Sequence, residues 1–202
     1  LIMFYMTPVW TTIFEIIFLN KKHGWQRVVS LGLALGGLWV VFGQGGNIPL
    51  PENAGDWLAL IGGIMFAGGM IRLEVIKTDG VFPIIFGFFF YGTLFNIGAG
   101  FLLVDYLGPM PSTEAFVSMT TFLVLISVFY FIPTGIVILW APTQIGAGIC
   151  SILFLSEIIV GAISSSILTE EPFGWRQITG CSLIVIGGIV AVVLSPKEDV
   201  SK

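Results

Sequence analysis

The chain has 202 residues, of which 56% are hydrophobic and only 10% are charged; its net charge is −4 and its mean hydropathy is +1.01. A water-soluble domain carries roughly 25% charged residues, because its surface must face water. The composition therefore excludes a soluble domain and predicts an all-α membrane protein that crosses the bilayer several times. Cys150 and Cys181 lie in apolar runs, so we expect buried packing residues rather than a disulfide or metal pair, and no cofactor.

Seven stretches of the chain are long and apolar enough to cross a bilayer, which takes about 20 residues. The break between the fifth and sixth is predicted at Ala141–Gln144, where Pro142 ends the fifth helix. Leu1 opens the chain inside an apolar run without the features of a signal peptide, so we expect the protein to continue ahead of it. The predicted spans are Leu1–Leu19, Trp25–Phe42, Trp57–Ile76, Val81–Val104, Phe116–Leu139, Gly146–Leu168 and Gln177–Leu194.

The charges of the predicted loops sort to the two sides of the membrane. Basic residues favour the cytoplasmic side, and alternating the spans places all basic residues except Arg176 on one side. That side carries the C-terminus, which we therefore expect in the cytoplasm. The cytoplasmic set is Lys21, Lys22, Arg27, Arg72, Lys77, Lys197 and Lys202, and the external acidic set is Glu52, Asp56, Asp105, Glu114, Glu170 and Glu171.

Two segments that lie 150 positions apart resemble each other. Gly24-Trp25-Gln26-Arg27 matches Gly174-Trp175-Arg176-Gln177, and the same offset aligns Gly37 with Gly187. The copies are an odd number of spans apart, so they are predicted to cross the membrane in opposite directions. Inverted repeats of this kind are typical of secondary transporters, whose substrate site lies near the membrane midplane between the repeats.

The succession of an apolar helix, a glutamate, a short turn, Gly-Trp-Arg-Gln and a glycine-rich helix resembles the second half of an EamA domain, from the drug/metabolite transporter superfamily. Asp56–Leu60 also looks like the start of that family's sixth helix. One departure is Glu157-Ile158, where the family often has a proline; the first-repeat position keeps it as Thr7-Pro8. Gly146–Leu194 carries the resemblance best, with Ala147, Glu157, Glu170, Gly180, Gly187 and Gly188 in the expected places.

The resemblance implies an inverted-repeat transporter bundle of ten helices, of which this chain holds helices four to ten, with about three more ahead of Leu1. It implies an incomplete first EamA repeat in residues 1–43, a second repeat in residues 55–195 and a cytoplasmic tail in residues 196–202. It also implies a carrier of a small metabolite or drug-like compound in the inner or plasma membrane, with both termini cytoplasmic.

Glu157 is the sharpest candidate for binding substrate or a proton. It lies near the middle of its predicted span, where a carboxylate is costly unless it faces a cavity or a partner. A carboxylate in such a place suits the coupling of proton movement to transport. The alternative is a protonated Glu157 that hydrogen-bonds a neighbouring helix.

The other candidates are polar residues in or near the remaining spans. Glu15 is expected near the cytoplasmic end of the first span, within reach of the headgroup region. Arg72 is expected to anchor or snorkel at the end of the third span. Thr93 and Asn96 point to an interhelical hydrogen bond or a pore lining, and Tyr130 to a cavity wall or to packing.

These patterns favour a secondary transporter, not an enzyme, which alternates access around a midplane site and has proton coupling as one option. The expected partners are a small-molecule substrate and the lipid bilayer, with no nucleic acid; a homodimer is a further option. The alternatives are a receptor, a structural membrane protein and a fragment that does not transport. A retinal pigment is excluded because Gln177–Leu194 contains no lysine for a Schiff base, and the sequence has no His-Glu-x-x-His motif.

Overall fold

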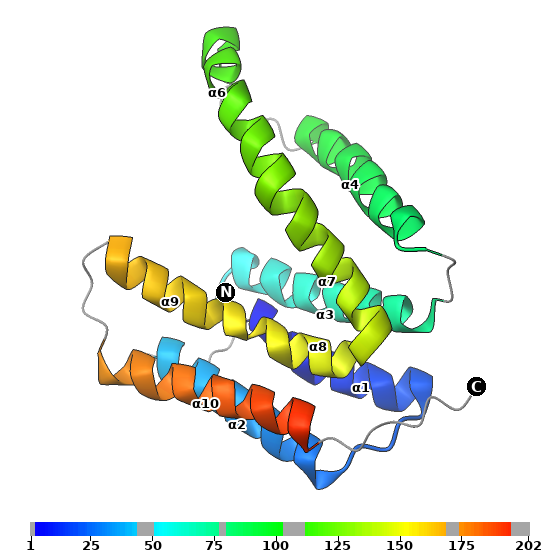
Figure 1. Ribbon diagram of the computed structural model, residues 1–202, viewed down its shortest axis with the longest axis vertical. Coiled ribbons are helices and arrows are strands. Elements are labelled where there is room, and N and C mark those ends of the chain that lie inside the picture. The colour runs from blue at the N-terminus through cyan, green and yellow to red at the C-terminus, as the bar shows by residue number, and fades with distance from the viewer. Residues whose placement is uncertain (1–2, 44–50, 77–79, 103–111, 169–173, 195–202) are drawn as a thin grey trace. The chain divides into compact units, whose positions relative to one another are not determined.

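The computed structural model describes residues 3–43, 51–76, 80–102, 112–168 and 174–194, and the regular elements within these ranges are all helical (Figure 1). Of these elements, η1 is a 3-10 helix and η2 is a π-helical segment inside a long helix. In chain order they are η1 (Phe4–Met6), α1 (Thr7–Leu19), α2 (Trp25–Phe42), α3 (Ala54–Val75), α4 (Phe82–Leu102), α6 (Thr113–Ile126), η2 (Ser127–Phe131), α7 (Ile132–Ile145), α8 (Ala147–Phe154), α9 (Ser156–Leu168) and α10 (Trp175–Val193).

Six helical segments in the described ranges are long and apolar enough to cross a membrane, so the chain is a multi-pass membrane protein. They overlap the second to seventh predicted spans, and Trp25–Phe42 agrees at both ends. The first predicted span corresponds to η1 and α1, Phe4–Leu19, a shorter apolar helix. At 1.5 Å per residue it extends about 24 Å, less than the roughly 30 Å of a hydrocarbon core. That Phe4–Leu19 crosses the bilayer stays a prediction.

The predicted helix break at Pro142 is wrong. Pro142 lies inside α7, which continues to Ile145. A proline removes one backbone hydrogen bond, and membrane helices tolerate this loss when neighbouring groups compensate. The chain turns instead at Gly146, whose φ of +83° is a left-handed conformation that glycine adopts without steric cost. The predicted span Gly146–Leu168 corresponds to Ala147–Leu168, within which a turn at Leu155 separates α8 from α9.

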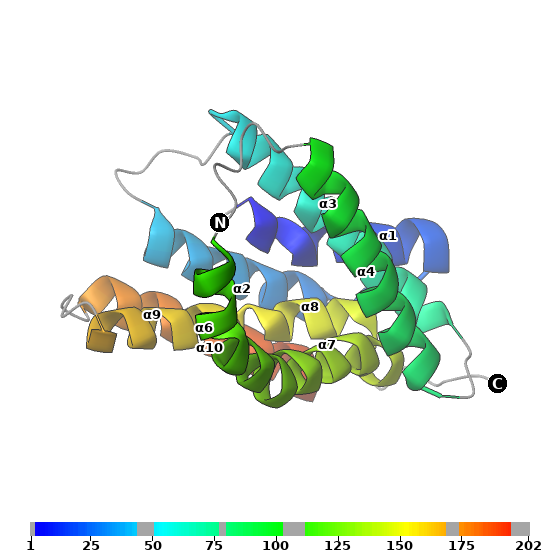
Figure 2. The ribbon, with the colours of Figure 1, turned by 90° about the horizontal axis from the view of Figure 1, so that it is seen from above.

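The chain divides into two compact units, of which the first comprises Leu1–Val75 and Pro142–Lys202. In this unit α1 lies alongside both α3 and α8 (Figure 2). Its apolar core forms where α2, α8, α9 and α10 meet. The buried residues of that core are Ala34, Leu38, Ile152, Leu155, Ile158, Ile184 and Ala191.

Helices α2 and α10 pack along each other in the first unit and run in opposite directions (Figure 1). A Cβ atom on Gly37 would lie 2.5 Å from the carbonyl oxygen of Gly180 and 3.0 Å from the amide nitrogen of Ile184. Only glycine allows two helix backbones to approach so closely. Near the other end of the contact, a Cβ atom on Gly187 would lie 2.9 Å from the carbonyl oxygen of Ser30 and 3.0 Å from the amide nitrogen of Ala34.

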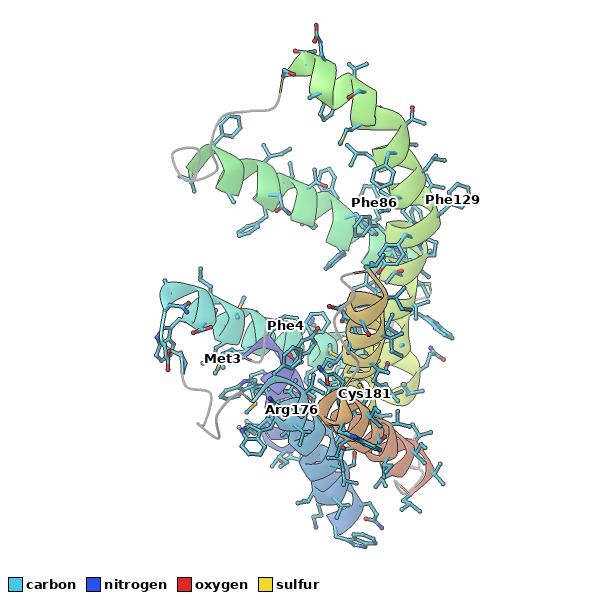
Figure 3. The ribbon with its side chains drawn as sticks, turned by 90° about the vertical axis from the view of Figure 1, so that its left-hand side faces the viewer. Met3, Phe4, Phe86, Phe129, Arg176 and Cys181 are labelled. Atoms are coloured by element: carbon cyan, nitrogen blue, oxygen red, sulfur yellow. The ribbon has the colours of Figure 1, made fainter. Side chains whose placement is uncertain are left out.

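The second unit is Ile76–Ala141, and within it α4, α6 and η2 contain no buried residue among those described. The rings of Phe82, Phe86 and Phe90 stack along α4, with centroids 6.2 Å and 5.5 Å apart. Figure 3 shows Phe129 projecting outward from its helix, and this side chain is exposed. Apolar surface of this extent is suited to contact with lipid chains or further helices, not with water.

Candidate functional site

Glu15 is a buried carboxylate near the C-terminal end of α1 in the first unit. Only 3% of the residue is exposed, and Thr7 and Thr11, which are also buried, precede it at intervals of four residues. Residues at this spacing share one face of a helix. Pro8 is the other buried residue of α1, so the buried face of the helix is mostly polar and ends in a charge.

Three basic side chains surround the Glu15 carboxylate. Nη2 of Arg27, in the first turn of α2, lies 3.3 Å from Oε2. Nζ of Lys21 lies 3.4 Å from Oε1, and Nε2 of His23 lies 3.4 Å from Oε2. Arg27 also donates hydrogen bonds to Oγ1 of Thr12 from Nε and Nη2, at 3.3 Å and 3.2 Å. The loop between α1 and α2 thus brings Lys21 and His23 back onto α1.

Glu74, in the last turn of α3, brings a second carboxylate to the same place. Its Oε1 accepts a hydrogen bond of 2.5 Å from Nζ of Lys21, and its Oε2 accepts one of 2.8 Å from the amide of Ala147. The next amide, that of Gly148, donates to Oε1 of Glu15 at 3.1 Å. We call Glu15, Lys21, His23, Arg27 and Glu74, with these two amides, the charge cluster.

The charge cluster satisfies the N-terminal end of α8. The first amides of a helix have no partner within the helix, and the helix dipole makes this end attractive to negative charge. Two carboxylates occupy it, and Lys21 and Arg27 balance their charge. Buried charges persist only when they are paired in this way, because desolvation of a lone charge is costly. The charge cluster therefore holds α1, the first turn of α2, α3 and α8 together.

A pair of hydroxyl groups continues the polar contact between α1 and α8. Oγ1 of Thr11 lies 2.8 Å from Oγ of Ser151, and Ser151 also donates to the carbonyl oxygen of Gly148 at 2.8 Å. Both residues are almost completely buried. Interhelical hydrogen bonds between small polar side chains are a common means of packing in membrane helices. They fix the register of α1 against α8 below the charge cluster.

Glu157 lies in the first turn of α9, directly after the break at Leu155, and its side chain is exposed. Both interpretations of Glu157, a substrate or proton site and a protonated side chain bonded to a neighbouring helix, stay predictions. Its carboxylate is close enough to the Tyr5 hydroxyl for an electrostatic interaction. Both residues belong to the first unit. Glu157 is thus a carboxylate open to its surroundings within a strongly apolar helix.

The remaining predicted site residues are not brought together. Arg72 is exposed on α3, in agreement with an anchoring role. Thr93 and Asn96 are exposed on α4, and Nδ2 of Asn96 donates 2.8 Å to the carbonyl oxygen of Gly92 in its own helix, not across helices. Tyr130 lies in η2 and is 59% exposed. These four residues form no shared site within either unit.

The side chain of Glu15 is buried in the charge cluster, and its expected position near the headgroup region stays a prediction. Sequence reasoning missed Glu74, Thr11 and Ser151 as polar contacts. The spacing of Thr7, Thr11 and Glu15 was a usable signal, since polar residues four apart mark one helix face. Several charges of the topology prediction lie outside the described residues, namely Lys77, Asp105, Glu170, Glu171, Lys197 and Lys202.

Comparison of the chain with models of protein families, with curated proteins and with solved structures gave no match. The α2–α10 contact, the charge cluster and the position of Glu157 are therefore the features that bear on function.

Proposed function

We propose that this chain belongs to a secondary transporter of the EamA type, which carries a small metabolite or drug-like compound across a cell membrane. Two inverted repeats would frame the substrate site, and access to it would alternate between the two sides of the membrane. The observation that carries the proposal is the contact between α2 and α10, the two helices that begin with the repeated Gly-Trp motif.

The α2–α10 contact is reciprocal when the two helices are compared at the offset of the sequence repeat. Gly37 approaches the backbone at two positions of α10, and Gly187 approaches the backbone at the two equivalent positions of α2. In a two-fold interface, a residue that contacts a position on the other surface has an equivalent residue that makes the same contact in return. The equivalent pairs are Gly37 with Gly187, Ser30 with Gly180, and Ala34 with Ile184.

The opposite directions of α2 and α10 also support the proposal. Repeats related by a two-fold axis in the membrane plane must cross the bilayer in opposite senses, and they place their shared site near the midplane. A direct tandem duplication with parallel helices would have α2 and α10 pointing the same way. The antiparallel pair favours the inverted arrangement.

Glu157 is the residue that we propose for substrate or proton binding. At the offset of the repeat it is equivalent to Thr7, beside Pro8. Its position next to an interrupted helix matches the construction of many transporter sites, in which broken helices surround the ligand. An exposed carboxylate in an apolar helix is costly unless water, a cation or a substrate reaches it.

The test compares the small-molecule content of cells that produce the protein with that of cells that do not. Mass spectrometry of cells and medium would follow each compound after induction. We expect at least one small metabolite to be redistributed severalfold across the membrane, and the redistribution to be lost in the Glu157→Gln variant at equal membrane abundance. An unchanged profile with abundant, correctly inserted protein would contradict the transporter proposal.

A further inference from the structure

Helix α8 is a short helix that lies between Gly146 and a turn at Leu155. It has eight residues, Ala147–Phe154. Gly146 precedes it in a left-handed conformation, and a turn at Leu155 separates it from α9. Gly146 and the turn at Leu155 are the two places at which the direction of α8 can change with few altered backbone angles, although Leu155 keeps a right-handed helical backbone.

The charge cluster holds the first turn of this segment. Glu74 accepts from the amide of Ala147 at 2.8 Å, and Glu15 accepts from that of Gly148 at 3.1 Å. A Cβ atom on Gly148 would collide with the guanidinium of Arg27 and the carboxylate of Glu15. The backbone of α8 thus rests directly on the ion pair, and α8 cannot move away without opening the cluster.

The Glu15–Arg27 pair has no counterpart at the equivalent positions of the second repeat copy. At the offset of 150, the position of Glu15 is held by Ser165 and that of Arg27 by Gln177. Oε1 of Gln177 accepts a hydrogen bond of 3.1 Å from the amide of its own N-terminal neighbour, Gly174. A serine and a glutamine cannot form an ion pair.

We infer that the charge cluster is a latch, which locks α8 against α1, α2 and α3 and keeps this end of the protein closed until it opens during transport. The inference rests on the proposed function, because a latch that must open during transport gives a carrier a preferred resting state. The opening motion is a displacement of the α8 N-terminus about Gly146 and Leu155. It separates Glu15 and Glu74 from the amides of Ala147 and Gly148.

Native Cys150 is a built-in reporter for this motion. It lies in α8, two residues after Gly148, and only 1% of it is exposed. We would label it with a water-soluble maleimide in lipid nanodiscs, where both membrane faces are accessible, in a Cys181→Ala background and without any substrate. The variants are Glu15→Gln, Glu74→Gln and Lys21→Gln, and Glu114→Gln, at an exposed position of α6, is the matched control.

We expect each latch variant to be labelled about tenfold faster than the parent, which corresponds to about 1.4 kcal/mol lost from the closed state. Glu114→Gln should leave the rate unchanged. Labelling of Cys181 in a Cys150→Ala background should also stay slow, because α10 is held by α2 and not by the latch. Lys21→Gln keeps the Arg27–Glu15 pair and is the variant most certain to fold.

Two results would overturn the latch. One is a Cys150 labelling rate that rises in none of the three variants. The other is an equal rise at Cys150 and Cys181, which would show general loosening instead of a movement of α8. Both measurements are made without substrate, so the latch can fail while transport is demonstrated. The latch can equally be demonstrated when no transported compound is found.

Discussion

Nη2 of Arg27 lies 3.3 Å from Oε2 of Glu15, and the two side chains are only 6% and 4% exposed. The pair joins α1 to α2 across the loop that connects them. Charges so completely removed from water depend on each other, since the loss of one leaves the other without compensation. The pair therefore stabilises the first unit, and it is also part of the proposed latch.

Removing one member of this pair should destabilise the protein strongly. We expect Glu15→Ala or Arg27→Ala alone to lower the free energy of unfolding by about 3–5 kcal/mol, because a buried charge is left unpaired. The double variant should lose much less than the sum of the two. Reversible unfolding in mixed micelles would measure this, with Glu114→Ala as the exposed control. Strict additivity of the two single losses would show that the charges do not interact.

Gly148→Ala tests the close approach of α8 to the same ion pair. The added methyl group would displace the Arg27 guanidinium and the Glu15 carboxylate, so we expect a loss of about 1–3 kcal/mol of stability through overpacking. Gly161→Ala, in α9, is the control because a Cβ there meets nothing within 4 Å. It should be neutral or slightly stabilising, since alanine favours helix. Equal effects of the two substitutions would contradict the packing described at Gly148.

The long apolar helices could be predicted from the sequence, because bilayer thickness dictates the length of a helix that crosses it. Trp25–Phe42 was located to the residue by its flanking glycines and polar residues. The breaks were harder. Pro142 is a strong local signal for a helix end, yet α7 continues through it and Gly146 makes the turn. Whether the helix ends at Pro142 or at Gly146 depends on tertiary packing, which a local sequence pattern does not contain.

The close approach of α2 and α10 can be tested by substituting Gly37, with the neighbouring Gly36 as the control. Gly37→Ala should cost about 1–3 kcal/mol, because its Cβ would press on the backbone of Gly180. Gly36→Ala should be neutral, since a Cβ there has nothing within 4 Å. Gly187→Ala should resemble Gly37→Ala, as the reciprocal contact requires. Thermal unfolding followed by tryptophan fluorescence would rank the three variants. A Gly36→Ala loss as large as that of Gly37→Ala would contradict the pairing.

The charge cluster could be predicted only in part. Glu15 stood out in the sequence as a carboxylate in an apolar helix, and Arg27 and Lys21 were visible as loop charges. Their partners Glu74 and the amides of α8 lie far along the chain, and nothing local links them to Glu15. The positive-inside pattern predicts on which side of the membrane Lys21 and Arg27 lie, but it does not indicate that they turn inward.

Glu157→Gln separates a functional carboxylate from a structural one. The side chain is exposed, so the substitution removes no packing and we expect an unchanged unfolding temperature. If Glu157 binds the coupling proton, uptake driven by a pH gradient in proteoliposomes should fall to the level without a gradient, because glutamine cannot be protonated in that range. Exchange of substrate at equal pH should persist. Full gradient-driven uptake in the variant would exclude Glu157 as the proton site, whereas a loss of both activities would indicate that it contacts the substrate itself.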